Sequence, residues 1–74
     1  MGSGLLSYEY ALKLGAKKTD IKDYDGTAVF KNKYDAFDIA NKLLKDLEKD
    51  GKNEFANTTV IPHCGPGHVI AFFK

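Results

Sequence analysis

The residues with the most reactive and most conformationally specialised side chains gather in one short segment, Pro62–His68. It holds both prolines, both histidines, the only cysteine and two of the seven glycines of this 74-residue sequence. Glycine permits positive φ and close backbone approach, whereas proline fixes φ. Consecutive amides in such a turn can form a concave anion site, and histidine can donate to a carboxylate or phosphate oxygen. The segment therefore predicts either an anion-binding turn or a rigid structural connection.

The predicted ligand site combines this turn with one aromatic residue of the apolar run that follows it. Its members are His63, Cys64, Gly65, Gly67, His68 and Phe72. The His63 side chain and the amides of Gly65 and Gly67 would hold an anionic group. Phe72 or Phe73 would help to line an apolar channel, because ligand pockets combine apolar walls with a few polar groups.

Two other chemistries are conceivable for His63, Cys64 and His68. Structural zinc sites use four ligands, typically in two separated pairs, and the sequence holds no further His or Cys. A cysteine nucleophile needs an activating histidine, but adjacent side chains of an extended chain point to opposite faces. We therefore predict no catalytic residue, no metal and no cofactor, and keep a minimal Cys or metal site as an alternative.

Charge and composition narrow the class of partner. Eleven lysines and ten acidic residues give a net charge of +1, and there is no arginine. The lysines alternate with acids along the chain, which argues against the single-signed surface that nucleic-acid binding requires. The longest apolar run, Val69–Phe73, is far shorter than the ~20 residues that span a bilayer. We expect a cytoplasmic protein without a membrane span that does not bind nucleic acid.

The first half of the chain predicts one helix and one or two strands. Residues 1–4 resemble a cloning remnant, which leaves 5–74 as a single small domain. Apolar residues at helical spacing predict a short helix over 5–14 that Ser7 can cap and that ends at Gly15. Asp25-Gly26 is a turn signal before a β-type run at 27–31. Residues 19–24 form either a strand paired with that run or a loop, and their weak alternation favours the loop slightly.

The second half predicts a long helix and a final hairpin. Apolar residues at three- and four-residue spacing predict a helix over 34–50, with Asp35 as cap and Gly51 at its end. Thr58–Ile61 and Val69–Phe73 predict the last two strands, joined through the Gly-Pro-Gly turn. The expected fold is α+β, a small two-layer α/β sandwich with two helices on a three- or four-stranded mixed sheet. A terminal apolar strand at the edge of that sheet would favour homodimerisation or strand addition.

The segment His63-Cys64-Gly65-Pro66-Gly67, between Val60-Ile61 and a last apolar run, resembles the end of DegV-family proteins. That family closes with a strand, a His-x-Gly-Pro-Gly turn and a final strand. Ala28-Val29-Phe30 and the helix that follows are similar to the strand and helix before that turn. The resemblance implies binding of a long-chain fatty acid, with His63 contacting its carboxylate, and presentation of the acid to a kinase. In the family, Ser and Thr hydroxyls of a separate N-terminal domain complete the site, and nothing in this sequence matches that domain.

The leading functional hypothesis is thus a non-enzymatic module that binds an anionic or fatty-acyl small ligand at the His-Cys-Gly-Pro-Gly turn. The alternative is a small protein-interaction or inhibitor module, homo- or hetero-oligomeric, in which the turn is purely structural. Because the chain is short, we expect a homo-oligomer or a partner protein to complete either kind of surface.

Overall fold

The computed structural model describes residues 3–51, 57–63 and 65–73, which contain two helices and five strands. In chain order they are β1 (Ser3–Leu5), α1 (Tyr8–Lys13), β2 (Ile21–Tyr24), β3 (Thr27–Phe30), α2 (Lys33–Lys49), β4 (Asn57–Pro62) and β5 (His68–Phe73). The α+β class with two helices on a sheet is confirmed. The sheet contains five strands in antiparallel pairings, where three or four strands in a mixed sheet were expected.

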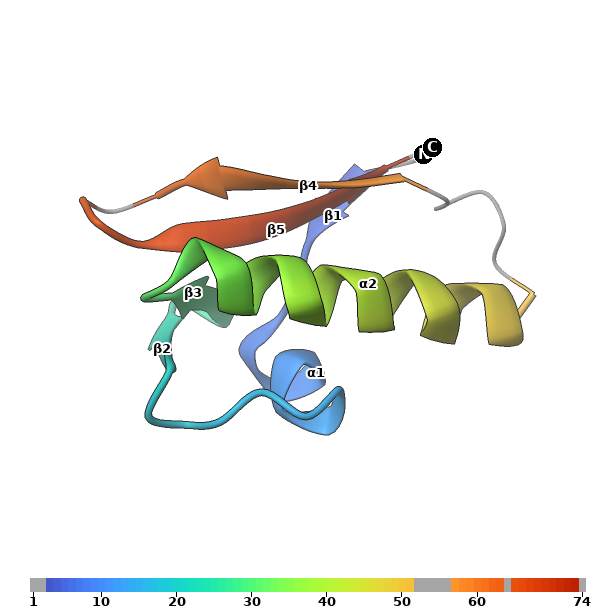
Figure 1. Cartoon of the computed structure of the whole chain (residues 1–74), viewed down its shortest axis with the longest axis horizontal. Coiled ribbons are helices and arrows are strands. Elements are labelled where there is room, and N and C mark those ends of the chain that lie inside the picture. The colour runs from blue at the N-terminus through green and yellow to red at the C-terminus, as the bar shows by residue number, and fades with distance from the viewer. Residues whose placement is uncertain (1–2, 52–56, 64, 74) are drawn as a thin grey trace.

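β5 is the central strand of this sheet (Figure 1). One of its edges pairs with β4 along the whole strand, from Asn57 opposite Phe73 to Pro62 opposite His68. The other edge is shared, because β1 pairs with the end of β5 and β3 pairs with its start. The prediction that the last strand lies at an edge is therefore wrong. β1, which had no strand signal of its own, covers the part of that edge that β3 leaves open.

Leu6 joins the two parts of the sheet. Its N–H donates to the Ile70 carbonyl over 2.9 Å, and its carbonyl accepts from the Ala28 N–H over 3.0 Å. Its side chain is only 1% exposed, within the core. The helix expected over 5–14 begins at Tyr8, and the Ser7 cap is confirmed, because its side chain accepts a hydrogen bond from the Tyr10 N–H.

The β2–β3 hairpin settles the alternative at residues 19–24 in favour of a strand. Ile21 pairs with Phe30 and Tyr24 with Thr27, and the intervening Asp23 carboxylate accepts from the Gly26 N–H over 2.8 Å. Asp25 and Gly26 both have positive φ, as a tight two-residue hairpin turn requires. Only Ile21 of β2 is buried, which explains its weak alternation.

α2 lies along one face of the sheet, and α1 packs on the same side (Figure 1). We call this helix-covered side the inner face and the opposite side the outer face. Core residues come from both helices and from the inner face: Leu6, Ala11, Ile21, Ala28, Phe30, Ala36, Ile39, Ala40, Leu43, Leu47 and Ile70. α2 spans nearly the predicted range, but its cap is Asn32 rather than Asp35, because the Asn32 side chain accepts from the Tyr34 N–H. No helix of the described chain is long and apolar enough to cross a membrane.

Candidate functional site

The predicted site segment is a tight connection between β4 and β5. The His63 N–H donates to the Gly67 carbonyl over 2.8 Å, which closes the turn. Gly65 has φ +72°, a conformation that residues with a Cβ rarely adopt, so glycine is favoured there. Of the other predicted site residues, Gly67 is buried and Cys64 lies outside the described residues.

The two histidines point to opposite faces of the sheet. His68 pairs with Phe30 and with Pro62, so its side chain lies on the inner face. His63 follows Pro62, and alternation along an extended chain places its side chain on the outer face. Each ring carries one buried nitrogen without a hydrogen-bond partner in the described structure, Nε2 of His63 and Nδ1 of His68. The turn therefore does not bring the two imidazoles together as a ligand pair.

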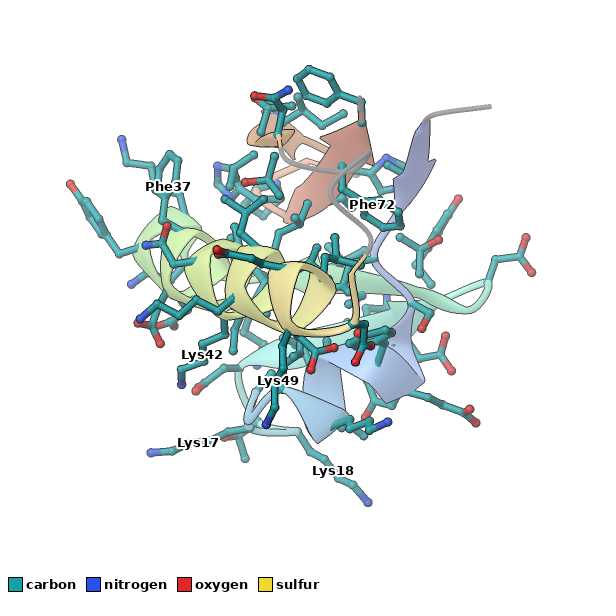
Figure 2. All side chains as sticks on the ribbon, turned by 90° about the vertical axis from the view of Figure 1, so that its right-hand side faces the viewer. Lys17, Lys18, Phe37, Lys42, Lys49 and Phe72 are labelled. Carbon is teal, nitrogen blue, oxygen red and sulfur yellow. The ribbon has the colours of Figure 1, made fainter. Side chains whose placement is uncertain are left out.

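Phe72 does not join the turn either. It pairs with Thr58 and Gly4, at the opposite end of β5 from His68. Its ring packs against the core, and a Cβ added to Gly4 would lie only 3.1 Å from that ring. Figure 2 shows Phe72 beside the sheet, apart from the exposed Phe37. Phe72 thus serves the packing of β1 onto β5, while the apolar residues near the turn are different ones.

An apolar groove of about 480 Å³ lies beside the turn. Its lining residues come from the β2–β3 hairpin and from the turn itself: Lys22, Val29, Phe30, Lys31, Pro66 and Gly67. The uncharged lining comes from the buried β3 pair Val29 and Phe30 and from the turn residues Pro66 and Gly67. The two lysines are exposed, so their ammonium groups can meet an anion without the cost of burying an unpaired charge.

Tyr24 and His63 bring the hairpin and the turn together. Their rings meet edge to face, with centroids 5.2 Å apart and an interplanar angle of 76°. Tyr24 shares the outer face with Val29, since it pairs with Thr27 two residues away. Val29 and Val69 belong to that face but are only 6% and 1% exposed, and they lie outside the main core cluster. The outer face is thus partly covered near the turn, where the groove forms.

A second cavity, of about 240 Å³, lies between the α1–β2 connection and the first half of α2. Its charged lining is mixed: Lys17, Asp20, Asp35, Asp38 and Lys42. Lys42 forms an ion pair with Asp38 at 3.4 Å. Figure 2 shows Lys17, Lys18, Lys42 and Lys49 on this side of the molecule. The interspersed carboxylates make it unsuited to a single anionic ligand, and the described residues contain no cluster of three or more metal-binding side chains.

Sequence reasoning missed Lys22, Val29, Phe30 and Lys31 as candidate site residues. The signal that could have found them was the Asp25-Gly26 turn. A two-residue hairpin at that turn pairs Lys22 with Val29, so both side chains lie on one face. Alternation then places Lys31 on the same face as Val29. That face only becomes a groove because the β4–β5 turn lies beside it, which the local sequence does not reveal.

The chain matches no protein-family model, and comparisons with curated proteins and with solved structures give no match either. The resemblance to the end of DegV-family proteins therefore stays a prediction.

Proposed function

We propose that this chain is a non-enzymatic binding module for an acidic amphipathic small molecule, with a fatty-acyl carboxylate as the preferred class. The ligand would occupy the groove lined by Val29, Phe30, Pro66 and Gly67. The observation that carries the proposal is the convergence of two lysines and an uncharged lining on one groove of about 480 Å³.

Each part of such a ligand has a counterpart in the groove. Lys22 and Lys31 would hold the carboxylate, because a charge-assisted hydrogen bond is stronger than a neutral one. The acyl chain would contact Val29 and Pro66, with each buried methylene contributing about 0.8 kcal/mol. The sequence has no arginine, so lysine is the cationic side chain available for this role.

His63 has a more indirect place in this proposal than the resemblance implies. Its backbone N–H is bonded to the carbonyl of Gly67, and its ring contacts Tyr24. Neither its ring nor Tyr24 lines the groove. His63 would therefore shape the groove through the turn, while its unpaired Nε2 offers a further polar contact to a ligand that reaches it.

Calorimetric titration with a sixteen-carbon fatty acid below its micellar concentration tests the proposal. We expect saturable binding of one acid per chain, and much weaker binding of the alcohol of the same length. The Lys22→Ala/Lys31→Ala double variant should bind the acid about tenfold more weakly, because the charged contacts are at an exposed rim. Lys17→Ala/Lys18→Ala is the matched control, since both residues are exposed and lie outside the groove.

Equal losses in the two double variants would contradict the assignment of the carboxylate to the groove. Absence of saturable binding would contradict the proposal as a whole. The His63→Ala variant distinguishes a carboxylate site formed by the two lysines alone from one that also includes the histidine. An unchanged affinity in that variant assigns the carboxylate to the lysines alone, whereas a loss comparable to that of the lysine variant gives the histidine a direct part.

A protein-interaction module is the second candidate function. It is favoured by the outer face, where Leu5, Ile61 and Phe73 are 46%, 40% and 39% exposed. The strand register places all three on this face, on three neighbouring strands. Changing Ile61 and Phe73 to Lys should leave fatty-acid binding intact, because neither residue lines the groove. The same change should abolish association with any partner that docks on this face.

A further inference from the structure

One side of α2 carries a regularly spaced row of side chains that do not belong to the main core. At three- and four-residue spacing it reads Lys33, Phe37, Asn41, Leu44 and Glu48, which we call the α2 stripe. Phe37 is 50% exposed and Leu44 half-buried, while the three polar residues are exposed. Figure 2 shows Phe37 on the side of α2 opposite to Lys42 and Lys49. The stripe therefore faces away from α1.

The neighbouring strand β4 has an edge open to pairing. Among the described strands it pairs only with β5, and Asn57–Pro62 contains no charged residue. Charged residues are the usual protection of an edge strand against pairing with another chain. The His63–Gly67 hydrogen bond sets the alternation of the ladder. Thr58 and Val60 therefore direct their backbone N–H and C=O groups outward, and Pro62 directs its C=O.

We propose that β4 and the α2 stripe form the interface of a two-fold symmetric homodimer. β4 would pair antiparallel with β4 of a second copy and extend the sheet across the interface. The two α2 helices would then run antiparallel over the extended sheet, each presenting its stripe to the other. This inference does not rest on the proposed ligand or on the groove.

The stripe is complementary to itself when it is reversed, as a two-fold axis requires. Reading it backwards places Glu48 opposite Lys33, Leu44 opposite Phe37, and Asn41 opposite its own copy. The lysine therefore faces a carboxylate, the two apolar side chains face each other, and the amide faces the amide of the second copy. The Lys33 ammonium lies 5.4 Å over the Tyr34 ring at the exposed start of the helix. This contact is compatible with a carboxylate on the other side of the ammonium.

The dimensions of the sheet agree with this arrangement. α2 contacts both β4 and β5, so it lies over the last two strands before the edge. Neighbouring strands are about 4.8 Å apart. If α2 lies midway over those strands, pairing of β4 with its copy sets the two helix axes about 10 Å apart, the usual distance for packed helices. The backbone pairing and the helix contact are thus satisfied together.

Sedimentation equilibrium of the purified chain measures the dissociation constant of the dimer directly. We expect a mass twice the monomer's 8.2 kDa at high concentration. Lys33→Glu and Glu48→Lys should each weaken the dimer about tenfold or more, because each replaces two attractive contacts with two repulsive ones. The double variant Lys33→Glu/Glu48→Lys should restore most of the affinity, since it exchanges the charges across the axis. Lys18→Glu, at an exposed position that belongs to neither β4 nor α2, is the control for the change in net charge.

A chain that stays monomeric up to millimolar concentration overturns the inference. So does a dimer that the single reversals leave unchanged, or one that Leu5→Lys and Phe73→Lys disrupt instead, because these two residues lie on the outer face and outside both β4 and α2. Circular dichroism on each variant verifies that the monomer is folded. Failure of the double variant to recover affinity, with both single variants folded, also counts against the antiparallel stripe.

Discussion

Tyr10 shows how a single polar contact ties two elements together. Its hydroxyl donates a hydrogen bond to the Asp46 carboxylate, which connects α1 to α2. This hydrogen bond, with burial and the negative charges of Asp46 and Asp50, raises the pKa of Tyr10 to about 12. Both helices also pack into the same core, so this contact helps to hold the short α1 against α2.

Replacing Tyr10 with Phe should lower the free energy of unfolding by about 1–2 kcal/mol, because Asp46 loses a hydrogen-bond donor. The wild-type stability should also depend on pH. An unfolded tyrosine loses its proton near pH 10, before the folded one does. The folded state therefore binds more protons between pH 10 and 12, and stability falls as pH rises through that range. Urea denaturation at several pH values measures this fall as the difference between wild type and Tyr10→Phe, which cancels the lysine titration. A difference that does not change with pH would contradict the assignment.

At the scale of elements, α2 depends on a cap that lies three residues before the predicted one. Asn32 accepts from the Tyr34 N–H, whereas Asp35 lies inside the first turn. Asn32→Ala should cost about 1 kcal/mol of stability through loss of the cap. Asp35→Ala should cost only a few tenths of that, through the helix dipole. Thermal or urea unfolding compares the pair, and a larger loss for Asp35→Ala would refute the cap assignment.

The sequence reveals those elements whose own residues carry a period. α2 was predictable because its apolar residues repeat at helical spacing over 17 residues. β4 and β5 were predictable from β-branched and apolar runs. β2 was not, because it is an edge strand with one buried residue and therefore lacks alternation. β1 is three residues long, and only its pairing with Ala71–Phe73 makes it a strand.

One part of the candidate site, the β4–β5 turn, was predictable because its own residues carry the pattern. The turn was visible in its glycines and prolines, and the positive φ of Gly65 agrees with that pattern. The structure does not bring His63, His68 and Phe72 together, because strand alternation and position along β5 separate them. Lys22 and Lys31 join the site through the register of a hairpin and the placement of a distant turn. Such a combination exists only in the folded chain.

At the scale of the whole molecule, the fold depends on a small core and on the residue that joins its two parts. A chain of 74 residues has only about 4–11 kcal/mol of net stability. Leu6 is 1% exposed and bridges β3 and β5, whereas the adjacent Leu5 is 46% exposed on the outer face. These neighbouring leucines therefore form a matched pair for measuring what the core contributes.

Leu6→Ala should lower the free energy of unfolding by about 2–5 kcal/mol, because it leaves a cavity where the two parts of the sheet meet. Leu5→Ala should change it by less than about 1 kcal/mol, since that side chain is largely solvated. Chemical denaturation of both variants tests this. Similar losses at the two positions would show that β1 is not held as described.

Our central proposal is that the groove beside the β4–β5 turn binds an acidic amphipathic ligand. The most direct measurement is a two-dimensional NMR titration of the isotope-labelled chain with a sixteen-carbon fatty acid. We expect saturable shifts concentrated on the amides of Lys22, Val29, Lys31 and Gly67. Shifts that never saturate, or that follow Leu5, Ile61 and Phe73, which lie outside the groove, would contradict the proposal.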